Sequence, residues 1–256
     1  GRGDDIFTIK GEEVPMWNIA NFLNSPSTGN DPYGALYSGI QRANIVLRYI
    51  DQIPASGITE EDRSMIKGEA LFLRGYQYFL LVNNYKEVPL RLIPSNEDET
   101  NKGPASEAAL WTQVEEDLGN AIKCNLPVER TTAKERVTKG AAIAMLGKVY
   151  ATQHKYPEAK QLLVSLLSAP YSYELVDDFA KNFTNEEEFN KESVYEIAYS
   201  PDGEYSWSNE SGICLGCYIP QFIGPVKSGG WAKLMPNSFI VGEFTKETRP
   251  NGADTN

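Results

Sequence analysis

Residues 141–150 read AAIAMLGKVY, a run in which apolar residues cover nearly every side of a helix. Such a helix is buried on most sides, because a surface helix keeps a polar face toward water. The sequence before it has the spacing of amphipathic helices, with apolar residues three and four apart over residues 33–53 and 60–85. The chain is therefore predicted to be mainly α-helical, with residues 141–146 at the centre of its core.

The apolar run continues into a helical hairpin. Leu146-Gly147 and Tyr150, followed nine residues later by Ala159, match the tetratricopeptide pattern, and Pro157 suits the first turn of the second helix. Gly147 and Ala159 are small and allow the two helices to approach closely. Leucines 162, 163, 166 and 167 are expected to face inward. Helices are predicted at 33–53, 60–85, 106–126, 132–153 and 157–169, with capping residues at Thr59, Ser106 and Thr132.

The texture of the sequence changes after residue 170. Residues 193–199 alternate and are rich in aromatic and β-branched side chains, which predicts a strand. Residues 200–236 form a Gly-, Pro- and Ser-rich loop region, and a short helix is expected at 236–246. The predicted organisation is an irregular segment at 1–32, tetratricopeptide-like helical repeats at 33–170, and a loop-rich ligand-binding region at 171–256 with a short strand and a short helix. The fold class is therefore mainly α with a few short strands.

Composition excludes several classes of function. The 256 residues carry a net charge of −11, which disfavours nucleic acid and anionic membrane surfaces as partners. The sequence contains no run of about 18 apolar residues, which is the length needed to span a bilayer. His154 is the only histidine and lies in a turn-like segment, so neither a multi-histidine zinc site nor a catalytic triad is expected. Cys214 and Cys217 lack the second pair that a zinc site would need, and no cofactor is predicted.

Five stretches in order resemble the SusD/RagB family of outer-membrane glycan-binding lipoproteins. They are QRANIVL at 41–47, GEALFLRGYQYF at 68–79 with Val88-Pro89-Leu90, VTKGAA at 137–142 through Tyr150, NKESVYEI at 190–197, and Gly229-Gly230-Trp231 with Pro236, Phe244 and Arg249. One departure is Lys86-Glu87, which stands where the family is expected to have a Gly-Asp turn. Family members are also much longer, so we expect this chain to be a piece of a single larger SusD-like domain.

The resemblance implies a SusD-like α-α superhelix and a non-catalytic function. Such proteins lie on the surface of Bacteroidota, capture oligosaccharides and pass them to a SusC-like TonB-dependent transporter. They are held at the outer membrane by a lipid on an N-terminal cysteine that this chain does not contain. The resemblance therefore implies an oligosaccharide ligand, a transporter partner and a role in polysaccharide utilization.

Loop aromatics are the candidate sugar platforms, because sugars present flat C–H faces edged by hydroxyl groups. Trp207 and Tyr205 lie in a polar loop sequence, and Trp17 lies in an irregular segment with Asn21 nearby. Asn21 and Arg2 could read sugar hydroxyls, which completes the predicted carbohydrate site. A lid over the core edge is the structural interpretation of Trp207, whereas Trp111 lies on a helical stripe and is expected to pack in the core.

A second function stays open at this point. The same helices could form a tetratricopeptide-type scaffold that binds a protein or peptide and no sugar. The loop region at 200–236 favours the glycan-binding hypothesis, because a plain helical scaffold does not need it.

Overall fold

The structure is a computed structural model that describes residues 6–7, 32–95, 102–199 and 223–246. The chain divides into two units, one formed by residues 32–198 and the other by residues 1–31 together with 199–256. The described part is mainly helical, as the sequence predicts, and its strands are only two residues long. No helix in the described ranges combines the length and apolarity needed to cross a membrane.

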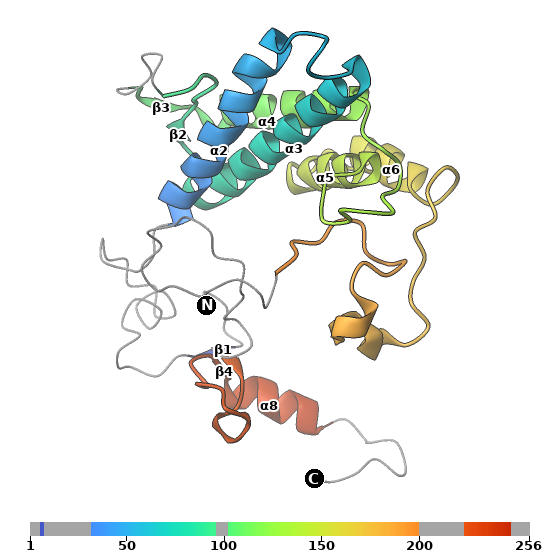
Figure 1. Ribbon diagram of the computed structural model, residues 1–256. Coiled ribbons are helices and arrows are strands. Elements are labelled where there is room, and N and C mark those ends of the chain that lie inside the picture. The colour runs from blue at the N-terminus through green and yellow to red at the C-terminus, as the bar shows by residue number, and fades with distance from the viewer. Residues whose placement is uncertain (1–5, 8–31, 96–101, 200–222, 247–256) are drawn as a thin grey trace. The chain divides into compact units, whose positions relative to one another are not determined.

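Successive helices pack side by side in the larger unit (Figure 1). They are α2 (Pro32–Tyr49), α3 (Glu60–Tyr85), α4 (Glu107–Lys123), α5 (Lys139–Thr152) and α6 (Tyr156–Ser165). Each packs mainly against its neighbours in the sequence, α2 on α3, α3 on α4, α4 on α5 and α5 on α6. The short turn η1 (Ile50–Gln52) follows α2, and β2 (Val88–Pro89) pairs antiparallel with β3 (Pro104–Ala105).

Side-chain caps explain where these helices begin. The Thr59 hydroxyl accepts a hydrogen bond from the Asp62 N–H at 3.0 Å, and the Ser106 hydroxyl accepts one from the Ala109 N–H at 3.3 Å. Each cap satisfies a backbone donor that the first helical turn leaves without an intrahelical partner. Both starts are confirmed.

The core lies along α3, α4 and α5. Fully buried side chains include Phe72, Tyr78, Leu81, Leu110, Val114, Leu118, Ala142 and Val149. The apolar centre of α5 is buried as predicted, and a Cβ on Gly147 would lie 2.7 Å from a methyl carbon of Leu163. That distance confirms the close approach of α5 and α6 that Gly147 permits.

A charged network crosses this core. Arg74 on α3 donates two hydrogen bonds to the Asp117 carboxylate on α4, at 2.7 and 2.8 Å, and a third to the Asn44 side-chain oxygen on α2 at 2.9 Å. The Asn44 amide in turn donates to the backbone carbonyls of Arg91 and Ile93, at 3.1 and 3.2 Å. All three side chains are buried. The network therefore joins three helices to the chain that follows α3.

The predicted start of the fourth helix is wrong. Helix α5 begins at Lys139 with Thr138 as its cap, not at Thr132. Residues 130–137 remain non-helical because Arg130 and Arg136 both pair with Glu69 on α3, and the Arg130 Nε also donates to the Val137 carbonyl at 3.1 Å. These tertiary ion pairs override the local preference for a helix start at Thr132.

The predicted strand at 193–199 is also wrong, because the structure assigns no strand to these residues. The alternating pattern instead turns Tyr195 toward α3, where its ring meets Phe72 edge-on at a centroid distance of 5.2 Å. β-Propensity reflects packing on a neighbouring strand, and no described strand lies alongside this segment.

The inward-facing stripe predicted for 157–169 holds only in part. Ala159 and Leu166 are buried, whereas Leu163 is 40% exposed and Leu167 is 78% exposed. Among the described elements, α6 packs chiefly on α5, and it ends at Ser165 before Leu167 is reached. The outer side of α6 consequently keeps apolar residues in contact with water.

The smaller unit contains a short sheet and a helix in its described residues. Strand β1 (Ile6–Phe7) pairs antiparallel with β4 (Met235–Pro236), with Ile6 opposite Pro236. The turn η5 (Val226–Ser228) precedes β4, and α8 (Ser238–Thr245) follows it with Asn237 as its cap, close to the predicted helix.

A strained three-residue turn ends α3. Lys86 has φ 65° and ψ −71°, and the Glu87 N–H donates to the Tyr85 carbonyl at 2.8 Å. This γ-turn with positive φ is rare for residues with a Cβ, because the side chain crowds the backbone. The position is where the family resemblance leads one to expect glycine.

Replacing Lys86 by Gly is expected to stabilise the protein relative to Lys86→Ala by about 1 kcal/mol, because glycine relieves the positive-φ strain. Both variants remove the exposed ion pair between Lys86 and Glu107, so their difference isolates the backbone effect. Urea unfolding of the two variants measures it. Equal stability of the two variants would contradict the assignment of strain to this turn.

Candidate functional site

The five residues that the sequence predicts for sugar binding lie outside the described residues. They are Arg2, Trp17, Asn21, Tyr205 and Trp207. Their roles and mutual proximity stay predictions. Trp111 is described, and it packs against the core through an edge-on contact with Phe79 at a centroid distance of 6.1 Å.

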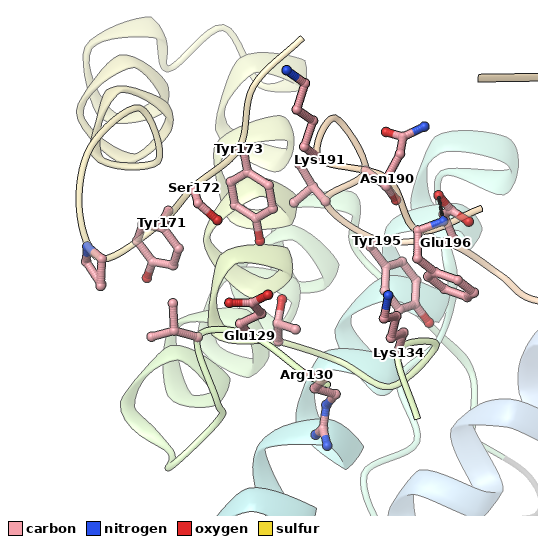
Figure 2. A pocket seen from close by; sticks show the side chains of 16 residues that line it. Glu129, Arg130, Lys134, Tyr171, Ser172, Tyr173, Asn190, Lys191, Tyr195 and Glu196 are labelled. Carbon is pink, nitrogen blue, oxygen red and sulfur yellow. Dashed lines mark hydrogen bonds between the residues drawn. The ribbon is translucent and has the colours of Figure 1, made fainter. Parts of the chain in front are cut away.

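A cavity of about 300 Å³ lies in the larger unit between the chain after α4, the chain after α6 and residues 189–196 (Figure 2). We call it the tyrosine pocket. Its lining residues are Val128, Glu129, Arg130, Lys134, Thr138, Pro170, Tyr171, Ser172, Tyr173, Phe189, Asn190, Lys191, Ser193, Val194, Tyr195 and Glu196. All of these residues belong to the part of the chain that the structure describes.

Two tyrosines form one side of the pocket. The rings of Tyr171 and Tyr173 are nearly parallel, at an interplanar angle of 10° and a centroid distance of 6.0 Å. Residues two apart in an extended segment point to the same side, which brings the rings together. Burial raises the pKa of the Tyr171 phenol, and the neighbouring Tyr173 raises it further. The phenol therefore stays a neutral hydrogen-bonding group through neutral pH.

Gly140 determines where Tyr173 can lie. A Cβ at Gly140 would overlap the Tyr173 hydroxyl and lie 2.9 Å from its ring carbon Cζ. Gly140 is buried in the first turn of α5, so the absence of its side chain is what admits the tyrosine. The pocket thus depends on a residue that does not line it.

Tyr195 lies across the pocket from this pair. Figure 2 shows Tyr171 and Tyr173 at the left, with Tyr195, Lys134 and Glu196 at the right. The edge-on contact with Phe72 joins the Tyr195 ring to the core. Burial is also the main cause that raises the pKa of Tyr195.

Charged groups of both signs surround the aromatic rings. Arg130 pairs with Glu69, which lies outside the pocket lining and also pairs with Arg136. Lys191 pairs with Glu174 at 3.3 Å, and the Glu196 carboxylate accepts from the Phe189 N–H at 3.1 Å. The pocket therefore offers donors and acceptors together, with no excess of one charge to select a strongly charged ligand.

A carboxylate ties two of the pocket segments to each other. Glu192 accepts hydrogen bonds from the Val176 N–H at 3.1 Å and the Asn182 amide at 3.2 Å. These donors hold the pKa of Glu192 below its usual range. Because the folded-state pKa is lowered, this contact stabilises the folded protein at pH values above the ordinary glutamate pKa. That stabilisation is lost as the pH falls through the lowered pKa. The segment is therefore anchored throughout the neutral range.

A second, more open cavity of about 550 Å³ runs beside α2. It is lined by Tyr33, Gly34, Tyr37, Ser38, Ile40, Gln41, Arg42, Asn44, Arg91 and Ser95. Asn44, one of its buried lining residues, already belongs to the buried network, and the Tyr37 hydroxyl donates to the Pro89 carbonyl. Asn44 and Tyr37 therefore use their polar groups to hydrogen-bond the backbone of the segment that follows α3.

Binding is the chemistry that these arrangements suit. Within the described residues, no group of three or more His, Cys, Asp or Glu could hold a metal ion. His154 lies exposed in the turn before α6, with its Nδ1 2.7 Å from the Tyr156 hydroxyl, which confirms the expected turn position. Cys214 and Cys217 lie outside the described ranges.

Sequence reasoning missed the tyrosine pocket. The Tyr171-Ser172-Tyr173 alternation directly after Pro170 was an available signal, because it predicts two aromatic rings on one side of an extended segment. The partners from residues 129–134 and 189–196 carried no such signal, since only the tertiary structure brings them to these tyrosines.

A comparison with known families identifies the helical unit. The family described as "Starch-binding associating with outer membrane" matches residues 9–151, which include α2, α3, α4 and nearly all of α5. The chain belongs to this SusD-like family. The buried Asn44 and Arg74 both lie in the stretches that carry the resemblance, so the matching sequence also builds the polar network of the core.

Solved structures share the fold of this SusD-like chain. A SusD superfamily protein from Bacteroides vulgatus is 28% identical, with a TM-score of 0.81 over 98% of this chain and 51% of that one. A laminarin-binding SusD-like protein is 30% identical, with a TM-score of 0.73 over 80% of this chain and 45% of that one. Surface glycan-binding protein A from Bacteroides thetaiotaomicron, solved with laminarihexaose, is 22% identical, with a TM-score of 0.78 over 94% and 53% of the two chains.

The SusD-like chain spans about half the length of these solved relatives. No curated protein sequence matches it.

Proposed function

We propose that this SusD-like chain binds oligosaccharide at the cell surface for uptake through a partner TonB-dependent transporter, without cleaving it. The observation that carries the proposal is the family match over residues 9–151, a family described by starch binding and association with the outer membrane. The helical packing that the solved relatives share supports it. The transporter, the lipid anchor and the outer-membrane location belong to the same proposal.

Two oligosaccharides are the first ligands to test. The relative that is 30% identical is described as laminarin-binding, which favours laminarihexaose. The description of the family by starch binding favours maltohexaose. Both are neutral chains of sugar rings, a ligand class compatible with a protein of net charge −11.

The main sugar platform is proposed to consist of Trp207 with Tyr205, and Trp17 is proposed as a second. Aromatic side chains in polar loop sequence expose an apolar face whose contact with water is unfavourable, and a sugar ring can cover it reversibly. Asn21 and Arg2 are proposed to hydrogen-bond the sugar hydroxyls. Hydrogen bonds that involve a charged group contribute about 1.5–3 kcal/mol, so Arg2 would add to specificity.

Replacing Trp207 by Ala tests this site. We expect a loss of affinity for the oligosaccharide of more than tenfold, because the stacking platform is removed, while the melting temperature stays close to that of the wild type. Isothermal titration calorimetry and thermal unfolding measure the two effects. Trp111→Ala is the matched control, since Trp111 packs on Phe79 and its loss should lower the melting temperature without lowering affinity.

The opposite pattern for Trp207→Ala would assign Trp207 to the core and remove it from the site. The same samples test for catalysis. No release of reducing ends is expected on prolonged incubation with either oligosaccharide, and steady release abolished by one carboxylate substitution would overturn the non-catalytic function.

A scaffold for protein or peptide is the second candidate function. The observation that favours it is the apolar outer side of α6, where Tyr156 is 60% exposed and Val164 is 51% exposed. Failure of both oligosaccharides to bind, together with capture of a defined peptide that Val164→Asp abolishes, would favour the scaffold.

A further inference from the structure

We propose that the tyrosine pocket is a carbohydrate site additional to the predicted loop aromatics, one that takes a single ring of a neutral oligosaccharide. The proposal rests on the proposed function, since it assumes that the chain binds glycans. It adds a site that contains none of Arg2, Trp17, Asn21, Tyr205 or Trp207, because the pocket is built from residues 128–196.

The size and aromatic content of the pocket fit this ligand. A cavity of about 300 Å³ lies at the small end of the usual range for small-molecule sites, which suits a single sugar ring rather than a long ligand. Tyr171 and Tyr173 are only partly buried, and their stacked rings leave aromatic surface exposed beside the cavity. The C–H face of a sugar can pack on such a surface.

The polar groups fit a neutral, hydroxyl-rich ligand. Within the described residues, Glu129 and Lys134 make no ion pair or hydrogen bond with another side chain, so an acceptor and a donor are available. Arg130 is engaged with Glu69, and Lys191 with Glu174. A site for an anion would leave several cations unpaired, whereas here Lys134 lies among the carboxylates of Glu129 and Glu196, and each of these groups can meet a hydroxyl.

The pocket is held open by the fold. Gly140 admits the Tyr173 ring, and the contact between Tyr195 and Phe72 fixes the opposite side to the core. The hydrogen bonds of Glu192 keep residues 176–182 joined to the segment that continues into the pocket. A ligand would therefore enter a site whose aromatic groups are already in place, which reduces the ordering that binding requires.

The first experiment locates the ligand. Tyrosine rings are isotope-labelled in the whole chain, and laminarihexaose and maltohexaose are titrated while the ring signals are followed by NMR. Signals are assigned with Tyr171→Phe and Tyr173→Phe. We expect the signals of Tyr171 and Tyr173 to shift with the bound oligosaccharide, and to shift in Trp207→Ala as well.

Two variants then alter the pocket in different ways. Tyr171→Ala removes one of the two stacked rings and is expected to weaken binding at the pocket by about threefold to tenfold, the range of a single aromatic contact. Gly140→Ala keeps every lining side chain but displaces Tyr173 into the cavity, and it should abolish the shift at Tyr171. Tyr156→Ala is the control, because Tyr156 is 60% exposed on α6 and does not line the pocket.

The outcomes separate the two proposals. Binding with no shift at Tyr171 and Tyr173, or with equal effects of Tyr171→Ala and Tyr156→Ala, overturns the additional site and leaves the proposed function standing. Shifts that vanish in Trp207→Ala also overturn it, because they would report one site rather than two. Failure of both oligosaccharides to bind the wild-type chain overturns both proposals. Shifts that persist in Trp207→Ala and disappear in Gly140→Ala support the additional site.

Discussion

Replacing Arg74 by Met is expected to lower the free energy of unfolding by about 3–5 kcal/mol, the usual loss when one partner of a buried ion pair is removed. The Asp117 side chain is only 2% exposed and would be left buried without its cationic partner. Asn44 would lose the donor to its side-chain oxygen, so the hydrogen bonds that link α2, α3 and the chain after α3 would weaken together. Urea unfolding measures the change.

Two further variants make this prediction specific. Lys67→Met breaks the exposed pair with Asp51, which has an N–O distance of 2.7 Å, and should cost no more than about 1 kcal/mol. The double variant Arg74→Met with Asp117→Leu removes both charges and should recover much of the stability, because an apolar pair leaves no buried charge behind. A loss in Arg74→Met no greater than in Lys67→Met would show that the network contributes little.

Phe72→Ala is expected to destabilise the protein by a similar amount, about 3–5 kcal/mol, because it empties a fully buried aromatic position. Phe72 is 1% exposed and lies between Tyr76, whose ring is parallel at a centroid distance of 6.3 Å, and Tyr195. The variant should also loosen the tyrosine pocket, since it removes the core contact of Tyr195.

Phe179→Ala is the matched control for this substitution. Phe179 is 74% exposed, and its removal should change stability by no more than about 0.5 kcal/mol. Chemical denaturation of the two variants compares a buried with an exposed phenylalanine in the same chain. Equal losses would place Phe72 outside the cooperative core.

Local sequence signals account for most of the helical unit. The apolar spacing of three and four residues predicted the helices, and Thr59 and Ser106 predicted two of their starts. Such signals act over one or two helical turns, so they can be recognised without knowing what the helix contacts. Gly147 was likewise recognisable, because a small residue at that position of a hairpin pattern indicates close helix packing.

Predictions failed where distant groups compete with a local preference. The capping pattern at Thr132 gives way to the ion pairs of Arg130 and Arg136 with Glu69, more than sixty residues earlier in the chain. The alternating segment around Tyr195 has strand propensity, but its tyrosine packs on Phe72 instead of joining a sheet. Neither contact can be predicted from the local sequence, because each joins residues that lie far apart in the chain.

The amino-acid sequence by itself determined the helical class of this protein, its SusD-like family and the aromatic residues worth testing as sugar platforms. Only the tertiary structure decided how Arg74, Asp117 and Asn44 satisfy one another in the core, and which groups face Tyr171 and Tyr173 across a cavity. The reason is physical: helix formation and capping depend on neighbours along the chain, whereas buried charges and pockets depend on groups that only folding brings together.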